Sequence, residues 1–168
     1  YCALQLPRDQ QITIVTKRDV ESSDSFLAQG GICMLKDESD YDSYFEDTLK
    51  AGHYENNKKS VDIMIRKSPE VIKDLMNYGV EFERENGELK YTLEGAHSEP
   101  RILFHEDLTG KEITSKLFEA VQKRPNVKML EYTTMVDLIS ENNRCKGILV
   151  RDKEGKVFEI KSDQVVLA

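Results

Sequence analysis

The sequence predicts an α/β fold in which a β-α-β unit is joined to a small antiparallel β-meander. Residues 11–17 are rich in β-branched side chains and follow a helical segment that Pro7 ends, as in the second half of a β-α-β unit. Within residues 58–79, apolar side chains recur at helical spacing. From residue 127 onward, short β-type runs alternate with turns, which is the pattern of a meander.

The N-terminal half contains most of the predicted helices. Residues 1–6 have the pattern of the last turns of a helix, and residues 18–31 form a polar loop that closes with two glycines. A helical insert is expected over about 40–79, with helices over 40–51 and 58–67. A further helix is expected to begin at Ser68-Pro69, because serine is a good N-cap and proline is favoured at the first helical position.

The C-terminal half is predicted to be mainly β. A β-hairpin is expected over about 80–93, because Asn86-Gly87 is a strong turn signal, and a loop over 94–110 follows it. A helix over 111–123 precedes the meander, which is expected over about 127–160. The final residues 165–168 have the pattern of a buried strand. Because both ends fall inside elements, residues 1–168 are interpreted as a fragment of a single domain.

Composition and charge exclude several classes of protein. The 168 residues carry 24 Lys+Arg against 31 Asp+Glu, a net charge of −7. Nucleic-acid binding needs clustered basic side chains, whereas acids and bases alternate throughout this chain, so we expect no nucleic-acid partner. The apolar runs are far shorter than the roughly 18 residues that cross a bilayer, and no signal-peptide pattern opens the chain. We therefore expect a soluble protein with no membrane partner.

The cysteines indicate neither a disulfide framework nor a metal site. Cys2, Cys33 and Cys145 are far apart, odd in number and without CxxC spacing. No metal site is therefore expected, and the pattern is typical of a reducing cytoplasm.

The segment that closes the 18–31 loop has the composition of a cofactor contact. In Ala28-Gln29-Gly30-Gly31 the paired glycines lack a Cβ, so the main chain could approach a flat ring or a pyrophosphate closely. Its place shortly after a strand of a β-α-β unit is where a dinucleotide cofactor binds. By itself, the glycine pair favours an ordinary turn, and the wider segment favours a cofactor contact.

Several segments in order resemble the flavoprotein family of L-aspartate oxidase, succinate dehydrogenase and fumarate reductase, most closely its L-aspartate oxidase members. The matching segments run from the N-terminal third to the last residue, namely 25–32, 46–52, 78–82, 94–98, 101–103, 109–110 and 165–168. The resemblance implies a partial Rossmann-like FAD-binding domain. In the family a first strand and a GxGxxG loop precede the helix that ends here at Leu6, and this chain lacks both.

The resemblance also implies which residues bind FAD. The expected contacts are the strand-end lysine and the loop residues, namely Lys17, Asp24, Ser25, Phe26, Leu27, Ala28, Gln29, Gly30 and Gly31. Family members with covalent flavin carry a histidine at the position of Asp24, and an aspartate cannot form that link, so noncovalent FAD is expected. Lys17 could reach a phosphate or present its backbone, although a solvated strand-end lysine is the alternative.

Glu94 is the expected substrate-orienting residue. Aspartate oxidases of the family are held to use a glutamate here, and the physical reason is that a carboxylate can pair with the ammonium group that distinguishes aspartate from succinate. Without the resemblance, Glu94 would be interpreted as a surface acid.

His97, Arg101 and His105 share the 94–110 loop and are possible substrate or flavin contacts. For both histidines a structural or solvent-facing role is the alternative. For Arg101 the alternatives are pairing with an acid and pairing with a substrate carboxylate. No catalytic residue is expected within this chain, because the family's catalytic arginine lies in later sequence.

The expected function is oxidation of L-aspartate to iminoaspartate, with hydride transfer to FAD and with oxygen or fumarate as acceptor. This reaction would be the first step of de novo NAD (quinolinate) biosynthesis, and quinolinate synthase would be a functional neighbour. The 168 residues alone are expected to be inactive and to bind FAD weakly, because the missing loop would hold the pyrophosphate. The alternatives are a succinate dehydrogenase or fumarate reductase subunit and a noncatalytic α/β binding module.

Overall fold

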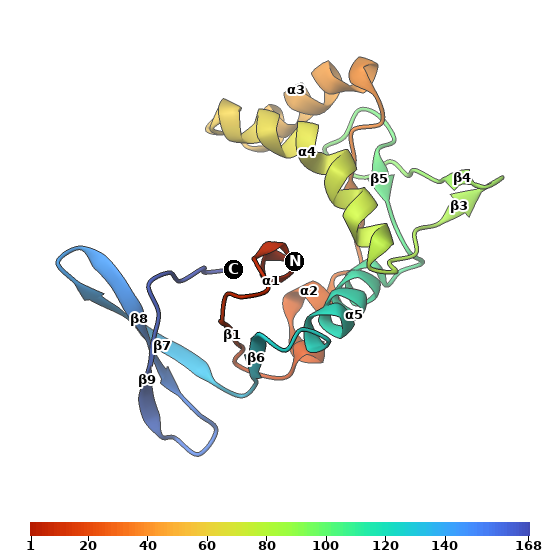
Figure 1. Ribbon diagram of the computed structural model, residues 1–168. Helices are drawn as coiled ribbons and strands as arrows, with labels where there is room; N and C mark the ends of the chain where they lie inside the picture. Colours follow the sequence, from red (N-terminus) through yellow and green to blue (C-terminus); the bar gives the residue numbers. More distant parts are fainter. The chain divides into compact units, whose positions relative to one another are not determined.

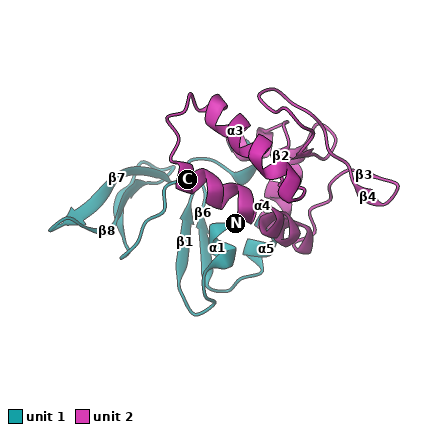
Figure 2. Ribbon diagram, turned by 90° about the horizontal axis from the view of Figure 1, so that it is seen from above, with its two compact units in different colours: residues 1–23, 118–168 teal, residues 24–117 magenta.

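The computed structural model describes residues 1–168, which form two compact units (Figure 2). The first unit consists of residues 1–23 and 118–168, and the second consists of residues 24–117. Figure 1 follows the chain through its helices and strands. The helix α5 (Thr109–Gln122) is shared, because its last turns belong to the first unit and its first turns to the second.

A parallel pair of strands in the first unit confirms the α/β class. Strand β1 (Ile12–Val15) pairs with β6 (Val127–Leu130), so that Ile12 lies opposite Val127 and Val15 opposite Leu130. Parallel neighbours need a long crossover, and the chain between β1 and β6 includes α5. The expected start of the meander at residue 127 is therefore wrong, because residues 127–130 pair with β1. An alternating strand pattern does not specify its pairing partner.

The antiparallel meander is formed by three consecutive strands. These are β7 (Thr134–Glu141), β8 (Arg144–Arg151) and β9 (Val157–Lys161), paired in that order. Asn142 and Asn143 connect β7 to β8 with φ angles of 52° and 58°, the left-handed backbone that a tight hairpin requires and that asparagine tolerates. The meander is therefore present but begins seven residues later than expected.

Arg124 holds the N-terminal segment of the first unit. The helix α1 (Cys2–Gln5) ends with carbonyl groups that have no partner within the helix. The buried guanidinium of Arg124 donates to the carbonyl oxygens of Ala3, Leu4 and Leu6 over 2.8, 3.0 and 2.9 Å. A cation at a helix C-terminus also interacts favourably with the helix dipole.

The second unit is built around two helices. The 3-10 helix η2 (Glu38–Asp40) leads into α3 (Tyr41–Ala51), and α4 (Lys58–Asn77) packs against α3. Buried apolar side chains form two groups. The group between these helices consists of Leu35, Tyr44, Leu49, Val61 and Ile65. The group beneath α4 consists of Ile72, Leu75, Val80, Phe82 and Leu103.

The expected break at Ser68-Pro69 is wrong, because α4 continues through both residues. Proline has no N–H to donate to the carbonyl of Ile65, four residues earlier. The hydroxyl of Ser68 donates to that carbonyl instead, over 2.7 Å. The same hydroxyl accepts the amide of Leu35 over 2.9 Å. The serine therefore satisfies the acceptor that the proline leaves free, and α4 changes direction within its length (Figure 1).

Short strands complete the second unit. Strand β2 (Ile32–Cys33) pairs with β5 (Ile102–Leu103), which lies in the segment expected to be a loop. The expected hairpin is present as β3 (Arg84–Glu85) and β4 (Glu88–Leu89), although it is shorter than 80–93. Two further short helices are η1 (Val20–Ser22) in the first unit and α2 (Asp24–Leu27) in the second.

The C-terminal segment differs from its expected form. Residues 165–168 form no strand, and Val166 and Leu167 are 69% and 66% exposed. A β-branched run becomes a strand only where a neighbouring strand takes up its backbone hydrogen bonds, and no strand pairs with this one. Among the helices, none combines the length and the apolar character needed to cross a bilayer.

We expect Arg124→Ala to lower the free energy of unfolding by about 2–3 kcal/mol, because it removes charge-assisted hydrogen bonds and leaves the carbonyls at the end of α1 without donors. Thermal unfolding of the full-length protein measures the effect. Arg144→Ala is the matched control, because Arg144 is exposed on β8. Equal melting temperatures for the two variants would contradict this role for Arg124.

Candidate functional site

The glycine-containing segment follows α2 and presents its main chain to solvent. Residues 28–31 are exposed, and the amide of Gly110 in the first turn of α5 donates to the carbonyl of Ala28 over 2.9 Å. A Cβ on Gly110 would overlap the carbonyl oxygen of Ser25. Gly110 therefore allows α5 to begin directly against this segment. The Thr-Gly pair was part of the resemblance, but its packing role was not predicted.

The two adjacent glycines are required for different reasons. A Cβ on Gly31 would overlap the carbonyl oxygen of Leu103 and the side chain of Ile102, so Gly31 is needed for the approach of β5. A Cβ on Gly30 would have a carboxylate oxygen of Glu94 at 3.8 Å as its nearest neighbour. The main chain at Gly30 is thus bare and exposed. Such a surface fits a flat aromatic ring, and a Cβ would occupy part of the space that the ring needs.

Glu94 lies beside the bare main chain of Gly30. An isolated bridge between Thr92 and Ile102 brings the start of the 94–101 loop next to β5, which itself pairs with β2 directly after the glycines. The side chain of Glu94 is exposed, so its carboxylate is available to a ligand. The sequence separates these residues by 64 positions, and the structure brings together the predicted cofactor segment and the predicted substrate-orienting acid.

Arg101 is buried and pairs with acids. Its Nη2 donates to Asp40 over 2.8 Å and its Nη1 donates to Asp47 over 2.7 Å. Its side chain is 0% exposed, and its Nη2 also donates to the hydroxyl of Ser43 over 2.7 Å. Of the two alternatives for Arg101, pairing with an acid is the one observed.

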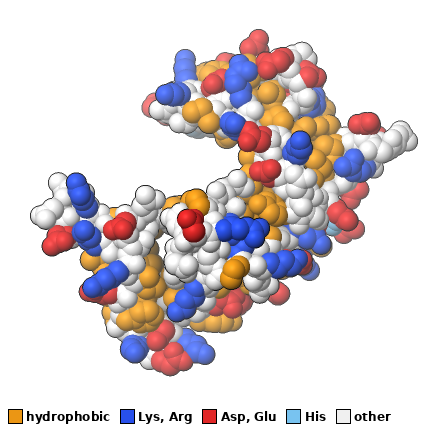
Figure 3. Space-filling view, viewed as in Figure 1, with side chains coloured by type: hydrophobic (Ala, Val, Ile, Leu, Met, Phe, Trp, Pro, Cys, Tyr) orange, Lys and Arg blue, Asp and Glu red, His pale blue; other side chains and the backbone are white.

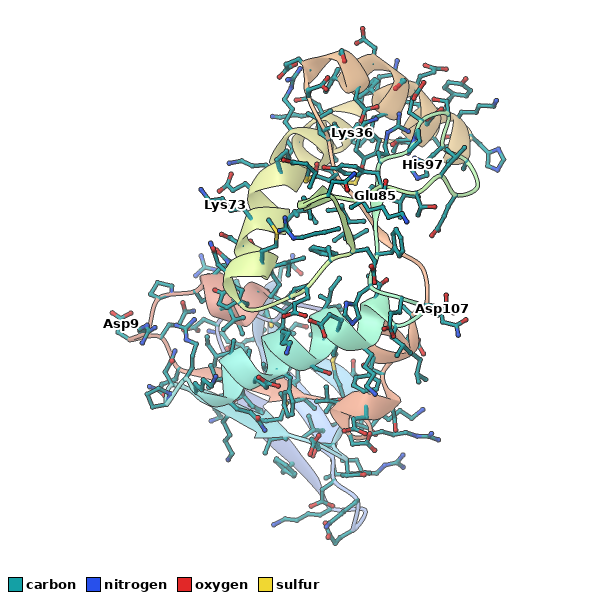
Figure 4. All side chains as sticks on the ribbon, turned by 90° about the vertical axis from the view of Figure 1, so that its right-hand side faces the viewer. Asp9, Lys36, Lys73, Glu85, His97 and Asp107 are labelled. Carbon is teal, nitrogen blue, oxygen red and sulfur yellow. The ribbon has the colours of Figure 1, made fainter.

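His97 bridges Arg101 and the strand that follows the glycines. Figure 4 labels His97 on the loop beside α3. Its Nδ1 lies 3.1 Å from Nη1 of Arg101, and its Nε2 lies 3.4 Å from the sulfur of Cys33 on β2. The ring also makes an edge contact with Tyr44, with centroids 6.1 Å apart. The ring is therefore held by protein groups on both of its nitrogens.

The charges around Arg101 shift the neighbouring titrations. Burial on its own raises the pKa of Asp47, but hydrogen bonds from Ser98 and Arg101 outweigh it and hold the pKa of this carboxyl below its usual value. Burial lowers the pKa of Arg101, whereas hydrogen bonds to Asp40 and Asp47 raise it overall. Burial raises the pKa of the Cys33 thiol, and the nearby Glu94 contributes in the same direction. The ion pair of Arg101 with Asp47 is therefore charged at neutral pH, and the thiol of Cys33 is protonated.

The remaining predicted residues occupy simpler environments. Lys17 is exposed and follows β1 in the first unit, whereas the predicted contacts 24–31 lie in the second. Phe26 is half-buried, with the ammonium of Lys111 at 5.9 Å from its ring centroid. The amide of His105 donates to the hydroxyl of Thr109 over 3.0 Å. Their contacts with FAD or substrate stay predictions.

The surface carries both signs of charge. Figure 3 shows Lys and Arg side chains interspersed with Asp and Glu on the face that it displays. No group of three or more His, Cys, Asp or Glu side chains is arranged to hold a metal ion. The candidate functional site is therefore the bare main chain of Gly30 with Glu94 beside it.

Comparison with known proteins shows the family of the chain. The family described as FAD binding domain matches residues 1–168, which is the whole chain. The chain belongs to this family. FAD is accordingly the cofactor of this FAD-binding domain. Contact of residues 28–30 with the flavin ring stays a prediction.

Two relatives of this FAD-binding domain are both named L-aspartate oxidase. The chain is 41% identical over 168 residues to an L-aspartate oxidase of Clostridium perfringens. This match covers 100% of this chain and 38% of that protein. It is 35% identical over 171 residues to an L-aspartate oxidase of Bacillus subtilis, covering 99% of this chain and 32% of that protein. The chain thus spans less than two fifths of the length of these relatives, and the resemblance stated from the sequence is confirmed.

Solved structures share the fold of the FAD-binding domain. A quinol fumarate reductase of E. coli superposes with a TM-score of 0.92 at 22% identity, over 99% of this chain and 29% of that chain. The Sdh1 complex of Mycobacterium smegmatis in its apo form gives a TM-score of 0.84 at 23% identity, over 96% of this chain and 30% of that chain. These matches confirm the predicted α/β class.

Alanine substitutions should separate the roles of the two glycines. We expect Gly31→Ala to destabilise the full-length protein by at least about 2 kcal/mol, because the new methyl group overlaps the main chain of β5. Gly30→Ala should leave the melting temperature of the apoprotein almost unchanged, because its Cβ has room, while weakening FAD binding by about tenfold or more. Differential scanning fluorimetry and FAD titration measure both effects. The opposite ranking in the two assays would contradict the assignment.

The lowered pKa of Asp47 predicts how stability depends on pH. A carboxyl whose pKa is lower in the folded state stabilises the fold above its unfolded pKa of about 4, and this stabilisation is lost as the pH falls through the folded value. We therefore expect Asp47→Asn to cost about 2 kcal/mol at pH 7 and progressively less below about pH 4. Melting temperatures of the full-length wild type and variant from pH 7 to pH 3 test this. A difference that is constant across this range would exclude the carboxylate charge as its source.

Proposed function

We propose that the protein containing this chain is an FAD-dependent oxidoreductase that converts L-aspartate to iminoaspartate. The observation that supports the proposal most directly is the carboxylate of Glu94 beside the bare main chain of Gly30. The relatives that match the chain at 35–41% identity are named L-aspartate oxidase. The chain supplies part of the FAD site and the substrate-orienting acid, and we place the catalytic residues in the remainder of the protein.

Glu94 would select an amine-bearing substrate. L-aspartate and succinate share two carboxylates, and the ammonium group of aspartate is the feature that differs. The carboxylate of Glu94 would attract that ammonium. It would repel succinate, a dicarboxylate that has no cation. Attraction to one substrate and repulsion of the other both favour aspartate.

The proposed chemistry is a two-electron oxidation of the Cα–N bond to an imine. Aspartate loses a hydride from Cα and a proton from nitrogen, and bound FAD would supply the hydride acceptor that oxygen or fumarate regenerates. Residues 28–30 would give the ring a flat, bare surface, and Glu94 would hold the substrate nitrogen on the same side. We infer noncovalent FAD, because Asp24 cannot form a histidyl link.

The biological setting follows from the product. We propose that iminoaspartate feeds quinolinate formation in NAD biosynthesis, with quinolinate synthase as the enzyme that consumes it. Three free thiols at Cys2, Cys33 and Cys145 support a reducing cytoplasmic location.

A fumarate reductase or succinate dehydrogenase activity is the second candidate, and the shared fold with quinol fumarate reductase favours it. Asp24 and Glu94 speak against it, because the first prevents the histidyl flavin link and the second repels a dicarboxylate. Substrate preference therefore distinguishes the two candidates.

We expect the full-length protein to oxidise L-aspartate with a kcat/KM well above that for succinate. Glu94→Gln should lower the ratio of the two values by about 10- to 100-fold, the equivalent of one charge-assisted hydrogen bond of about 1.5–3 kcal/mol. Steady-state turnover with each substrate measures the ratio. Glu99→Gln is the matched control, because Glu99 is an exposed acid of the same loop. Preference for succinate in the wild type, or an unchanged ratio in Glu94→Gln, would refute the proposed function.

A further inference from the structure

Arg101 uses its whole guanidinium for contacts within the second unit. A guanidinium has five N–H donors and no acceptor. Nε donates to Asp40 over 3.2 Å, Nη2 donates to Asp40 and to Ser43, and Nη1 donates to Asp47 and faces Nδ1 of His97. The backbone carbonyl of Arg101 accepts the amide of Met34 over 2.9 Å. One buried side chain thus connects η2, α3 and the 94–101 loop.

The contact with Arg101 fixes the state of the His97 ring. Because the guanidinium can only donate, Nδ1 of His97 has to be the acceptor. The ring proton is therefore on Nε2, and it points at the sulfur of Cys33 on β2. The ring consequently connects the 94–101 loop to the strand that directly follows the glycines.

The same contacts determine where Glu94 lies. The amide of His97 donates to the carbonyl of Glu94 over 3.3 Å. The amide and hydroxyl of Ser98 both donate to Asp47, over 2.7 and 2.8 Å. The exposed side chain of Glu94 makes no ion pair of its own. Its position beside Gly30 therefore depends on a loop that Arg101 and Asp47 hold.

We propose that Arg101 is a positioning residue that sets the preference for an amine-bearing diacid by holding Glu94 beside Gly30. The inference rests on the proposed function, and it assigns to a fully buried arginine a role in substrate selection without substrate contact. Lysine cannot replace it, because an ammonium has three donors at one point and cannot reach Asp40, Asp47 and His97 together. The loop would then be held less firmly, and Glu94 would leave its place beside the main chain.

A double-mutant cycle in the full-length holoenzyme tests the inference. The variants are Arg101→Lys, Glu94→Gln and the combination, and the readout is the ratio of kcat/KM for L-aspartate to that for succinate. Arg101→Lys should lower this ratio about tenfold in the wild-type background and less than twofold in the Glu94→Gln background, because it acts through Glu94. A merely structural role would change both backgrounds by the same factor. Arg66→Lys is the matched control, because Arg66 is an exposed, ion-paired arginine of α4, and its ratio should be unchanged.

Hydrogen–deuterium exchange gives a readout that does not require turnover. Arg101→Lys should accelerate exchange in peptides that cover residues 93–100 by about tenfold and leave peptides from β7 and β8 unchanged. If Arg101→Lys does not fold, Asp47→Asn replaces it in both experiments, because it releases Ser98 while Arg101 keeps its pair with Asp40. Unchanged exchange in the loop would overturn the positioning role.

The outcomes separate the two proposals. A wild-type enzyme that oxidises succinate in preference to L-aspartate overturns the proposed function, and with it the role of Arg101 in selection. An aspartate-selective enzyme in which Arg101→Lys and Glu94→Gln act independently overturns the role of Arg101 alone. A non-additive cycle together with faster loop exchange supports both.

Discussion

The buried guanidinium of Arg101 between two carboxylates is the interaction on which the second unit depends. Arg101 is 0% exposed and Asp40 and Asp47 are 4% and 14% exposed, so the two acids and the cation have been withdrawn from water together. Removal of Arg101 would leave both carboxylates without their buried cation, at a cost of about 3–5 kcal/mol. The ring of Tyr44 lies 5.0 Å from the guanidinium carbon and closes the cluster on a further side. The group therefore fixes the loop against α3 much more firmly than surface ion pairs would.

The firm attachment of the loop matters because the functional surface makes few stabilising contacts of its own. Residues 28–31 are exposed coil, and Glu94 is exposed as well. Both are defined by their neighbours: Gly31 by β5, Ala28 by the first turn of α5, and Glu94 by the loop. A rigid interior thus supports an open surface, which is the arrangement expected where a cofactor and a substrate must enter.

Much of the fold could be predicted from local patterns, and what failed depended on partners distant in the sequence. Asn86-Gly87 predicted its hairpin because the turn conformation is a local property of these residues. The pairing of Val127–Leu130 with β1 could not be predicted, since a strand pattern is the same for either partner. Pro69 predicted a helix boundary because its missing N–H is a local fact, whereas the Ser68 hydroxyl that compensates for it depends on three-dimensional geometry. For the site, the resemblance implied Glu94 and the glycines, but the buried role of Arg101 depends on Asp40 of η2 and Asp47 of α3, which are distant in the sequence.

The central claim is that the bare main chain at Gly30 and the carboxylate of Glu94 form one surface for flavin and substrate. A structure of the full-length protein with FAD and L-aspartate bound tests it most directly. We expect the flavin ring to lie against residues 28–30, with the carboxylate of Glu94 about 3 Å from the substrate nitrogen. A flavin ring bound elsewhere, or a Glu94 carboxylate turned away from that nitrogen, would contradict the account.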